Sequence, residues 1–355
     1  MVKNANRTQP EHDKLQRAIL DWYGSSRRDL PWRAAPGEVA DSYHVWLSEI
    51  MLQQTTVATV GPYYHDFLKR WPTIQDLAAA PLDDVLHGWQ GLGYYARARN
   101  LHRCASVVAA EHGGVFPADE AALLKLPGIG HYTAGAIAAI AFGLPTTAVD
   151  GTVERVIARM HGLDTPLPDV KPEITALARG LAPAERSGDY LQAVMDLGAT
   201  TCTPRKPSCG RCPWAGFCIA HAAGNAESLP NRRPSPERPT RRGVAFWALA
   251  GNGDILLRRR PEKGLLGGMM EIPSTEWRET ELDMEAAIAG APFKADWTEL
   301  DGMVRHTFTH FHLELMVMTA RAPDRNADGV WCPIYRLSDH ALPTIMKKIV
   351  KHALE

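Results

Sequence analysis

The sequence predicts a mostly α-helical N-terminal part followed by a small α+β C-terminal domain, and three observations predict this. Over residues 12–222, apolar positions recur at helical spacing between Pro and Gly turn signals. Residues 229–242 are rich in Pro and Arg and poor in apolar side chains, which is typical of an extended linker. Beyond residue 243 the apolar pattern alternates as in strands. We therefore predict the following division: domain 1–222, linker 223–242 and domain 243–355.

The composition excludes several classes of protein. Hydrophobic residues make up 45% and charged residues 22%, which is typical of a globular enzyme rather than a disordered or fibrous chain. No stretch approaches the ~20 apolar residues of a membrane span, and the polar N-terminus does not resemble a secretory signal or transit peptide. We expect a cytoplasmic protein with no membrane contact. The net charge of −1 does not indicate a nucleic-acid partner, so any such partner must be argued from local patches.

The first candidate catalytic group is Glu49, in a predicted helix over residues 45–55. At ~100° per residue, Glu49 falls inside an apolar arc with Val45, Trp46 and Leu52. Burial disfavours the charged form of a carboxylate and raises its pKa, which suits a general acid. The pattern also allows a carboxylate held in a buried salt bridge.

Residues 91–103 place two adjacent tyrosines beside arginines, among them Arg97. Aromatic rings next to positive charge are typical of nucleic-acid binding. A solvated helix face is the alternative that this segment leaves open.

Residues 126–130 read Leu-Pro-Gly-Ile-Gly and directly precede a predicted helix rich in small residues. Gly128 and Gly130 would let backbone N–H groups point at a phosphate, and the small residues would allow close helix packing. An ordinary turn between two helices is the alternative.

Asp150 precedes Gly-Thr and a helical pattern, so its simplest interpretation is a helix N-cap. If Asp150 also faces the same cavity as Glu49, the pair would contain one protonated and one ionised carboxyl group. Such a pair suits the cleavage of a glycosidic bond.

Four of the six cysteines crowd together, at Cys202, Cys209, Cys212 and Cys218. Without an export signal, this cluster predicts a metal site rather than disulfides. Zinc remains possible, but structural zinc sites usually pair two short knuckles, and only one gap here is short. A [4Fe–4S] cluster is therefore favoured. Arg205 and Lys206 lie in the first gap, where they could meet phosphates, whereas Cys104 and Cys332 are expected to be buried free thiols.

The C-terminal domain is predicted to begin with a β-hairpin that turns at Gly251-Asn-Gly253. Residues 306–315 alternate like a strand or a strand-ending loop, and residues 342–354 follow a helical pattern.

Taken together, residues 126–142 with Asp150, residues 46–55 and residues 202–218 resemble the helix-hairpin-helix DNA glycosylases, and among them the MutY family of adenine DNA glycosylases. The resemblance covers about residues 15–350. It implies a helix-hairpin-helix glycosylase fold with a [4Fe–4S] module and a Nudix-like C-terminal domain. It also implies a monomer that removes adenine opposite 8-oxoguanine or guanine from double-stranded DNA by base flipping, a step of base excision repair on nucleoid DNA.

The resemblance further implies a role for each matching residue. Glu49 would protonate adenine N7, Asp150 would stabilise or trap the sugar cation, and Tyr132 would hydrogen-bond within the site. The expected adenine pocket comprises Leu30, Trp32, Arg33 and Gln192. The expected DNA contacts comprise Gln54 and Tyr94 as wedges, the amides of Gly128 and Gly130, and the side chains of Arg97, Arg205 and Lys206. Phe308, Thr309 and His310 would read 8-oxoguanine.

Three positions test this resemblance. Tyr132 stands where the related lyase, endonuclease III, has the lysine that forms a Schiff base, so lyase chemistry is disfavoured. Thr152 and Thr309 stand where the family usually has Asn and Ser. The alternatives are a damage sensor without chemistry and a lyase-competent enzyme.

In the Nudix-like domain, Glu271 and the carboxylates of 278–283 are out of register with a magnesium-binding box, so we expect binding without hydrolysis.

Overall fold

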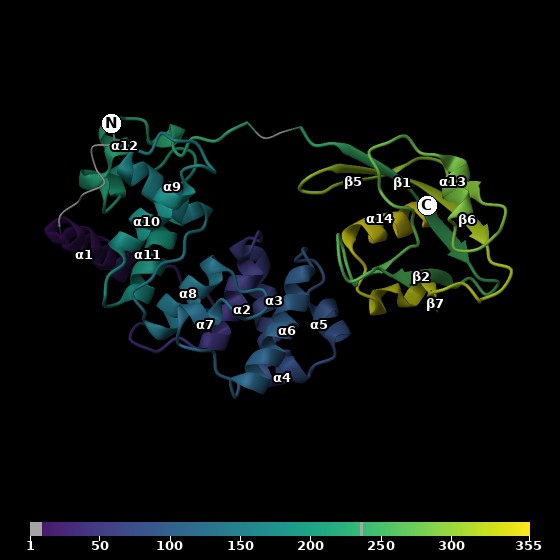
Figure 1. Ribbon diagram of the computed structural model, residues 1–355, viewed down its shortest axis with the longest axis horizontal. Coiled ribbons are helices and arrows are strands. Elements are labelled where there is room, and N and C mark those ends of the chain that lie inside the picture. The colour runs from purple at the N-terminus through teal and green to yellow at the C-terminus, as the bar shows by residue number, and fades with distance from the viewer. Residues whose placement is uncertain (1–8, 235–236) are drawn as a thin grey trace. The chain divides into compact units, whose positions relative to one another are not determined.

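The computed structural model describes residues 9–234 and 237–355, which form two compact units. The first unit comprises the described residues up to Ala79 together with Asn100–Pro234, and the second comprises Ala80–Arg99 with the rest of the chain. Helices dominate the first, purple to teal in Figure 1, and a mixed sheet dominates the second, green to yellow. The predicted fold class is confirmed. The first eight residues of the predicted N-terminal domain, and residues 235–236 of the predicted linker, lie outside the described part.

The helical unit is built from the following elements: α1 (Gln9–Ser26), α2 (Ser42–Leu52), α3 (Val57–Arg70), α4 (Ile74–Ala79), most of α6 (Ala96–Glu111), α7 (Glu120–Leu123), α8 (His131–Phe142), α9 (Gly151–His161), α10 (Lys171–Leu181), α11 (Ser187–Thr200), α12 (Ile219–Ala222) and the 3₁₀ turns η1 (Cys209–Arg211), η2 (Ala215–Phe217) and η3 (Ala226–Ser228). Helix α8 packs against both α2 and α11. It can do so because its side chains are mostly small, and most of them are buried.

The predicted helix-hairpin-helix consists of α7, residues 124–130 and α8. Gly128 has φ +75°, a conformation that favours glycine, and a Cβ there would lie 2.7 Å from Cβ of Asn100. On α8, a Cβ at Gly135 would lie only 2.5 Å from the backbone oxygen of Thr147. The missing side chain therefore lets the segment that leads to Asp150 lie directly against α8.

Helix α9 carries a buried arginine toward the cysteine-rich loop. Arg159 is 1% exposed and donates hydrogen bonds to the backbone oxygens of Leu229, Cys202, Thr203 and Pro204, at 2.9, 3.3, 2.7 and 3.0 Å. A buried guanidinium needs such acceptors, and here they come from the chain around the four cysteines. Arg155, one turn earlier on α9, also donates from Nε to the oxygen of Cys202 at 2.8 Å, so two side chains attach the loop to α9.

The first part of the predicted linker lies along the helical unit. The backbone N–H of Leu167 donates to the oxygen of Asn231 at 2.9 Å, and Asn231 Nδ2 donates to the oxygen of Asp164 at 2.8 Å. Arg233 forms an ion pair with Asp169. The linker boundaries at 223 and 242 remain a prediction.

The second unit contains a seven-stranded sheet with β1 (Thr240–Leu249) and β6 (His312–Arg321) at its centre. These two strands are parallel and pair along their whole length, from Thr240 with His312 to Leu249 with Arg321. The other strands are β2 (Ile255–Arg259), β3 (Met270–Glu271), β4 (Thr298–Glu299), β5 (Val304–Thr307) and β7 (Val330–Cys332). The predicted β1–β2 hairpin is confirmed, with Leu249 opposite Ile255.

The sheet buries both faces under short helices. On one face Leu313, Leu315 and Val317 pack in a cluster with α14 (Thr344–Leu354), which confirms the predicted C-terminal helix. On the other face Val244 and Phe246 pack with α13 (Met284–Ala289). Helix α5 (Leu82–Gly88) also belongs to this unit, where Asp83 pairs with Arg259 at 2.9 Å, and η4 (Ile334–Asp339) completes it.

Glu271 in this unit is occupied structurally. It is 1% exposed, and its two oxygens pair with Arg258, at 2.8 Å, and with Arg260. A carboxylate neutralised by two guanidinium groups is a poor magnesium ligand, which supports the expectation that this domain binds without hydrolysis. Within the described ranges, no helix is long and apolar enough to cross a membrane.

Substitution of Gly135 tests the close approach of α8 to the segment before Asp150. The added methyl of Gly135→Ala would meet a backbone oxygen, so we expect a loss of about 1–3 kcal/mol in the free energy of unfolding. Gly180→Ala in α10 is the matched control, because nothing lies within 4 Å of its Cβ position. This control should be neutral or slightly stabilising. Urea unfolding of both variants makes the comparison, and equal effects would contradict the packing described.

Candidate active site

The helical unit contains a cavity of about 900 Å³ between α2, α8, α9, α11 and the loop after α1. The cavity is lined by most of the residues that the sequence predicts for the site. These are Leu30, Trp32, Arg33, Glu49, Gln54, Gly130, Tyr132, Asp150 and Gln192. Glu49 and Asp150, far apart in the chain, therefore line one cavity, as the interpretation of Asp150 required.

Glu49 is buried in the wall of the cavity, with 6% of the residue exposed. Its Oε2 accepts a hydrogen bond from the hydroxyl of Tyr132 at 2.8 Å. Burial raises the pKa of Glu49 to about 7, partly offset by the Tyr132 hydrogen bond and the charge of Arg33, and reinforced by Asp150. The predicted burial and raised pKa are confirmed. No ion pair to Glu49 is found among the described residues; its polar partner is a phenol.

Tyr132 lies at the start of α8, directly after the hairpin. Burial and the neighbouring carboxyl groups of Glu49 and Asp150 raise the pKa of Tyr132 well above its ordinary value. Its hydroxyl therefore keeps its proton and acts as a donor to Glu49. This arrangement fixes the orientation of one carboxyl oxygen of Glu49.

Asp150 caps α9 and lines the cavity at the same time. Its Oδ1 accepts hydrogen bonds from the backbone N–H groups of Thr152 and Val153, at 2.9 and 2.7 Å. In the described part of the chain no donor reaches Oδ2. The N-terminal end of the helix stabilises the negative charge, so one oxygen of a charged carboxylate remains available to the cavity.

Arg33 is held by a carboxylate that the sequence analysis missed. Asp196 is 0% exposed and accepts two hydrogen bonds from Arg33, both at 2.7 Å, and one from the backbone N–H of Arg28 at 3.0 Å. Burial alone would raise the pKa of Asp196, but the bonds and charges of Arg33 and Arg28 outweigh it and lower the pKa. The available signal was an isolated acid in an apolar part of α11, one turn beyond Gln192.

The remaining pocket residues lie around this pair. Trp32 is buried and packs edge-on against Tyr64, with 5.6 Å between ring centroids. Gln192 donates to the backbone oxygen of Gly188 at 3.3 Å, within its own helix. Trp32 is thus held by packing, whereas Gln192 is tethered only to its own helix.

The residues predicted to wedge into DNA share an unusual backbone conformation. Gln54 has φ +57° and Tyr94 has φ +46°, values that side chains other than glycine rarely adopt. Gln54 follows α2 in the helical unit. Tyr94 belongs to the second unit, where its hydroxyl contacts that of Thr309.

Several predicted DNA contacts lie outside the cavity lining. Arg97 donates to the backbone oxygen of Leu92 at 2.7 Å and stacks over Trp89, 5.1 Å from the ring centroid, so it braces its own loop. Arg205 and Lys206 are exposed in the cysteine-rich loop. Gly128 lies in the hairpin, beside Asn100.

The predicted 8-oxoguanine loop is the turn between β5 and β6 in the second unit. Phe308 points into its own unit, stacked on Phe311 with 4.8 Å between ring centroids and next to Trp277 at 5.8 Å. Thr309 and His310 are exposed. Phe308 therefore anchors the turn, while its two neighbours face outward.

Cys202, Cys209, Cys212 and Cys218 line one small cavity in the helical unit, together with Arg159. All four are free thiols, and Arg159 donates to the sulfur of Cys202 at 3.3 Å. No group of three or more His, Cys, Asp or Glu with single-ion geometry is found among the described residues. Four sulfur donors with a cationic hydrogen-bond donor beside them fit an anionic iron–sulfur cluster.

Removal of the buried counter-ion should destabilise the helical unit. Asp196→Ala leaves two arginines beside the cavity without their carboxylate, and we expect a loss of about 3 kcal/mol in unfolding free energy. Asp189→Asn on the same helix is the control, because its pair with Arg186 is exposed and should contribute less than about 1 kcal/mol. Denaturant unfolding measures both. A loss for Asp196→Ala no larger than for the control would show that the buried pair is not structural.

Comparisons with family models agree with this geometry. Residues 47–181 match the HhH-GPD superfamily of base excision DNA repair proteins. Residues 202–218 match the iron-sulfur binding domain of endonuclease III, and residues 244–352 match the NUDIX domain. The chain therefore has the parts of a DNA glycosylase with an iron–sulfur module and a Nudix-like domain.

Among solved structures, a thermostable thymine-DNA glycosylase is 30% identical with a TM-score of 0.54, covering 61% of this chain and 100% of its own. A non-covalent endonuclease III–DNA complex, 23% identical with a TM-score of 0.51, covers 62% of this chain and 99% of its own and shows the shared fold alone.

Curated relatives cover more of the chain. An adenine DNA glycosylase from Buchnera aphidicola subsp. Acyrthosiphon pisum is 31% identical over 94% of this chain and 96% of its own length. The human adenine DNA glycosylase is 38% identical over 94% of this chain and 73% of its own length. Because this match spans both units, the chain belongs to the adenine DNA glycosylase family.

Proposed function

We propose that this glycosylase hydrolyses the N-glycosidic bond of adenine paired with 8-oxoguanine or guanine in duplex DNA, and that it is monofunctional. The observation that carries the proposal is the buried Glu49, with a pKa near 7, in one cavity with Asp150. One carboxyl group can hold a proton at neutral pH while the other is ionised, which is the requirement for glycosidic bond cleavage. The protein would act as a monomer on nucleoid DNA.

The acid step belongs to Glu49. A carboxyl group that is protonated at neutral pH donates its proton to N7 of adenine, and the base then leaves as a neutral molecule. Tyr132 binds one oxygen of Glu49 and so orients the other toward the base. This division of the two oxygens supports a positioning role for Tyr132.

The charge-stabilising step belongs to Asp150. As the glycosidic bond breaks, positive charge develops on the sugar, and the free Oδ2 of Asp150 stabilises or covalently traps it. Water then completes the hydrolysis. Thr152 provides its backbone N–H to Oδ1 and has no amide side chain, in contrast to the usual family residue.

The pocket residues receive the flipped adenine. Flipping costs a few kcal/mol and costs least at a mispair, which favours the mismatched base. Leu30, Trp32 and Gln192 would contact the base, and Arg33, kept in place by Asp196, would add a fixed positive charge.

The remaining contacts hold the duplex. Gln54 and Tyr94 enter the base stack, and the amides of Gly128 and Gly130 bind the phosphate backbone. Arg97, as part of the Tyr94 loop, supports that wedge. Thr309 and His310 read 8-oxoguanine from a turn anchored by Phe308, and the methyl group of Thr309 adds bulk where the family usually has Ser.

We assign a [4Fe–4S] cluster to Cys202, Cys209, Cys212 and Cys218. When bound, such a cluster joins four thiolates of one short segment and thereby fixes the fold of the loop between them. That loop carries Arg205 and Lys206, which are exposed and would meet DNA phosphates. Arg159 would offset the negative charge of the cluster.

A lyase reaction is disfavoured by the amines near the site. Tyr132 occupies the position of the lyase lysine. Lys171 also lines the cavity, but its Nζ lies 2.8 Å from Glu154 in an ion pair, so a carboxylate already engages this amine.

Glu49→Gln and Asp150→Asn should each lower adenine release by about 10²–10⁴-fold with DNA binding retained, because each removes one charge function and keeps the side-chain shape. The measurement is a single-turnover assay on a duplex with adenine opposite 8-oxoguanine, labelled on the adenine strand. Asp189→Asn serves as the control and should be unaffected.

The same assay, read with and without hot alkali, tests the reaction type. We expect strand cleavage only after alkali. Cleavage without alkali that is lost in Lys171→Gln would establish lyase chemistry, and tight binding without cleavage under either condition would leave a damage sensor.

The rate of adenine release should fall as the pH rises through about 7, because Glu49 loses the proton that it must donate. The Tyr132 hydrogen bond lowers the pKa of Glu49, so Tyr132→Phe should raise that pKa and move the descending limb to higher pH. Single-turnover rates are measured for both proteins from pH 5 to 9, about two units on either side of the expected pKa, and locate the descending limb of each. If the descending limb does not move in Tyr132→Phe, the fall in rate is not caused by the ionisation of Glu49.

A further inference from the structure

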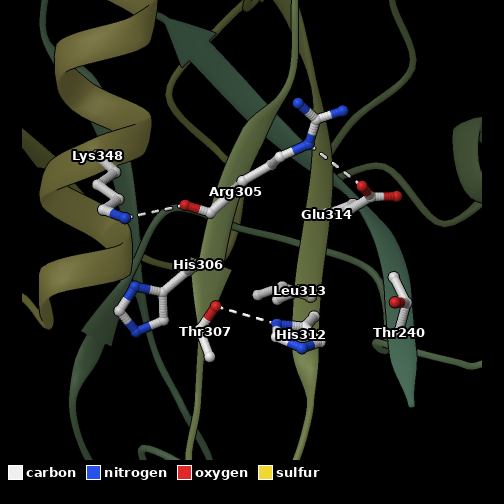
Figure 2. Close-up of a pocket in the computed structure, with 8 residues that line it drawn as sticks. All are labelled: Thr240, Arg305, His306, Thr307, His312, Leu313, Glu314 and Lys348. Atoms are coloured by element: carbon white, nitrogen blue, oxygen red, sulfur yellow. Dashed lines mark hydrogen bonds and ion pairs between the residues drawn. The ribbon is translucent and has the colours of Figure 1, made fainter. Parts of the chain in front are cut away.

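The second unit contains a groove of about 540 Å³ that no step above uses. Figure 2 shows its lining along the neighbouring strands β5, β6 and β1, with Arg305 on β5 and with Lys348 on α14, beside the edge strand β5. Thr307 and His312, at the base of the β5–β6 hairpin, also line it. The groove thus begins where the turn with Thr309 and His310 ends.

The strand register explains why this part of the sheet is polar and open. Farther along β1 and β6, Val244, Phe246 and Met318 face a cluster that includes α13. Because side chains on one face alternate along a strand, the same face continues toward the hairpin with polar residues. The cross-strand rows there are Thr307, His312 and Thr240, and then Arg305, Glu314 and Arg242.

The balance of charge in the groove is positive. Glu314 is its carboxylate, and it lies 3.2 Å from Arg305 and 3.6 Å from Arg242, so two guanidinium groups face one acid. The side chain of Arg305 is 74% exposed, and its ion pair uses Nε, which leaves both terminal nitrogens without a hydrogen bond to any described residue. Lys348 adds a further cation.

Lys348 is the basic side chain with a defined position at the edge strand. Lys348 Nζ donates to the backbone oxygen of Arg305 at 2.9 Å, as the dashed line in Figure 2 marks, and keeps two N–H groups for another acceptor. Burial and the charge of Lys348 lower the pKa of His306, which is therefore neutral at physiological pH.

Two further polar side chains complete the site. Thr307 Oγ1 lies 3.0 Å from Nδ1 of His312, so the two side chains are oriented by each other. Hydroxyl and imidazole groups beside arginine and lysine are the side chains that bind phosphate oxygens in protein–DNA interfaces.

The distance to the hairpin tip sets which phosphate is in reach. Arg305 precedes Thr309 by four residues, which corresponds to about 13 Å along a strand at ~3.3 Å per residue. Nucleotides of one DNA strand advance by ~3.4 Å each. A base held at Thr309 and His310 would therefore place backbone phosphates about two to four nucleotides away at the groove.

We propose that this groove binds a backbone phosphate of the DNA strand whose base is read by the 309–310 turn, through Arg305 and Lys348. The choice of strand rests on the proposed function of that turn. The groove therefore adds affinity and fixes the register of the strand, without reading sequence.

The test compares single charge removals with matched controls on the same unit. Arg305→Gln is paired with Arg278→Gln, since Arg278 is 71% exposed and has a single acidic partner, Glu276, outside the groove. Lys348→Gln is paired with Lys347→Gln, its exposed neighbour on α14. The full-length protein is titrated with a duplex carrying 2′-fluoro-deoxyadenosine, which resists release, opposite 8-oxoguanine. We expect each groove variant to bind the duplex about 3–10-fold more weakly. The slope of log affinity against log salt concentration should fall by the amount that corresponds to about one phosphate contact.

A scan of the 8-oxoguanine strand with single neutral methylphosphonate linkages locates the phosphate. A neutral linkage at one or two positions, about two to four nucleotides from 8-oxoguanine, should weaken binding of the duplex by the wild-type protein. The same linkage should not weaken binding by Arg305→Gln any further. Groove variants that match their controls, or linkages whose effects simply add in every variant, would overturn the proposal. Adenine release from the unmodified duplex at saturating protein should be unchanged in the groove variants. If the wild type itself releases no adenine, the proposed function fails, whereas the comparison of affinities still decides the groove.

Discussion

The proposed chemistry of the helical unit depends on one buried carboxyl group, Glu49, and its phenol partner, Tyr132. A carboxylate in such a wall loses its hydration, and only the neutral acid is comfortable there. Tyr132 supplies one donor, which lowers the pKa of Glu49 and so offsets part of the effect of burial. The surrounding fold follows from this requirement: α2 and α8 must pack closely enough to exclude water, and the small side chains of α8 allow it.

Helix α9 joins the two chemically distinct parts of the unit. Asp150 caps its first turn, and Arg159 near its other end binds the loop of the four cysteines. An 11-residue helix spans about 16 Å, so α9 acts as a rigid spacer between Asp150 and the cysteine-rich loop. The cysteine-rich loop is therefore tied to the helix that begins at Asp150 through the side chains of Arg155 and Arg159.

Local patterns predicted much of this arrangement, and non-local pairing accounts for what they missed. The apolar arc around Glu49, the cap signal at Asp150 and the cysteine spacing each lie within a few turns of chain, so the sequence reveals them. The partner of Arg33 lies 163 residues away at Asp196, and no local pattern names it. Likewise, alternation identified β1 and β6 as strands, but their parallel pairing depends on the whole sheet. The tyrosines beside Arg97 predict a phosphate contact, but no local pattern reveals that the backbone oxygens of Leu92 and Gly93 accept hydrogen bonds from its guanidinium.

The cap at Asp150 separates folding from catalysis within a single side chain. One oxygen accepts the hydrogen bonds of the helix cap, and the other is left to the cavity. An asparagine at this position can still accept the same backbone hydrogen bonds, so a chain inactivated here remains folded and able to hold DNA. Such a chain would occupy a mispair without repairing it and would shield the lesion from other enzymes. Loss of function at this residue is therefore capable of being worse for the cell than loss of the protein.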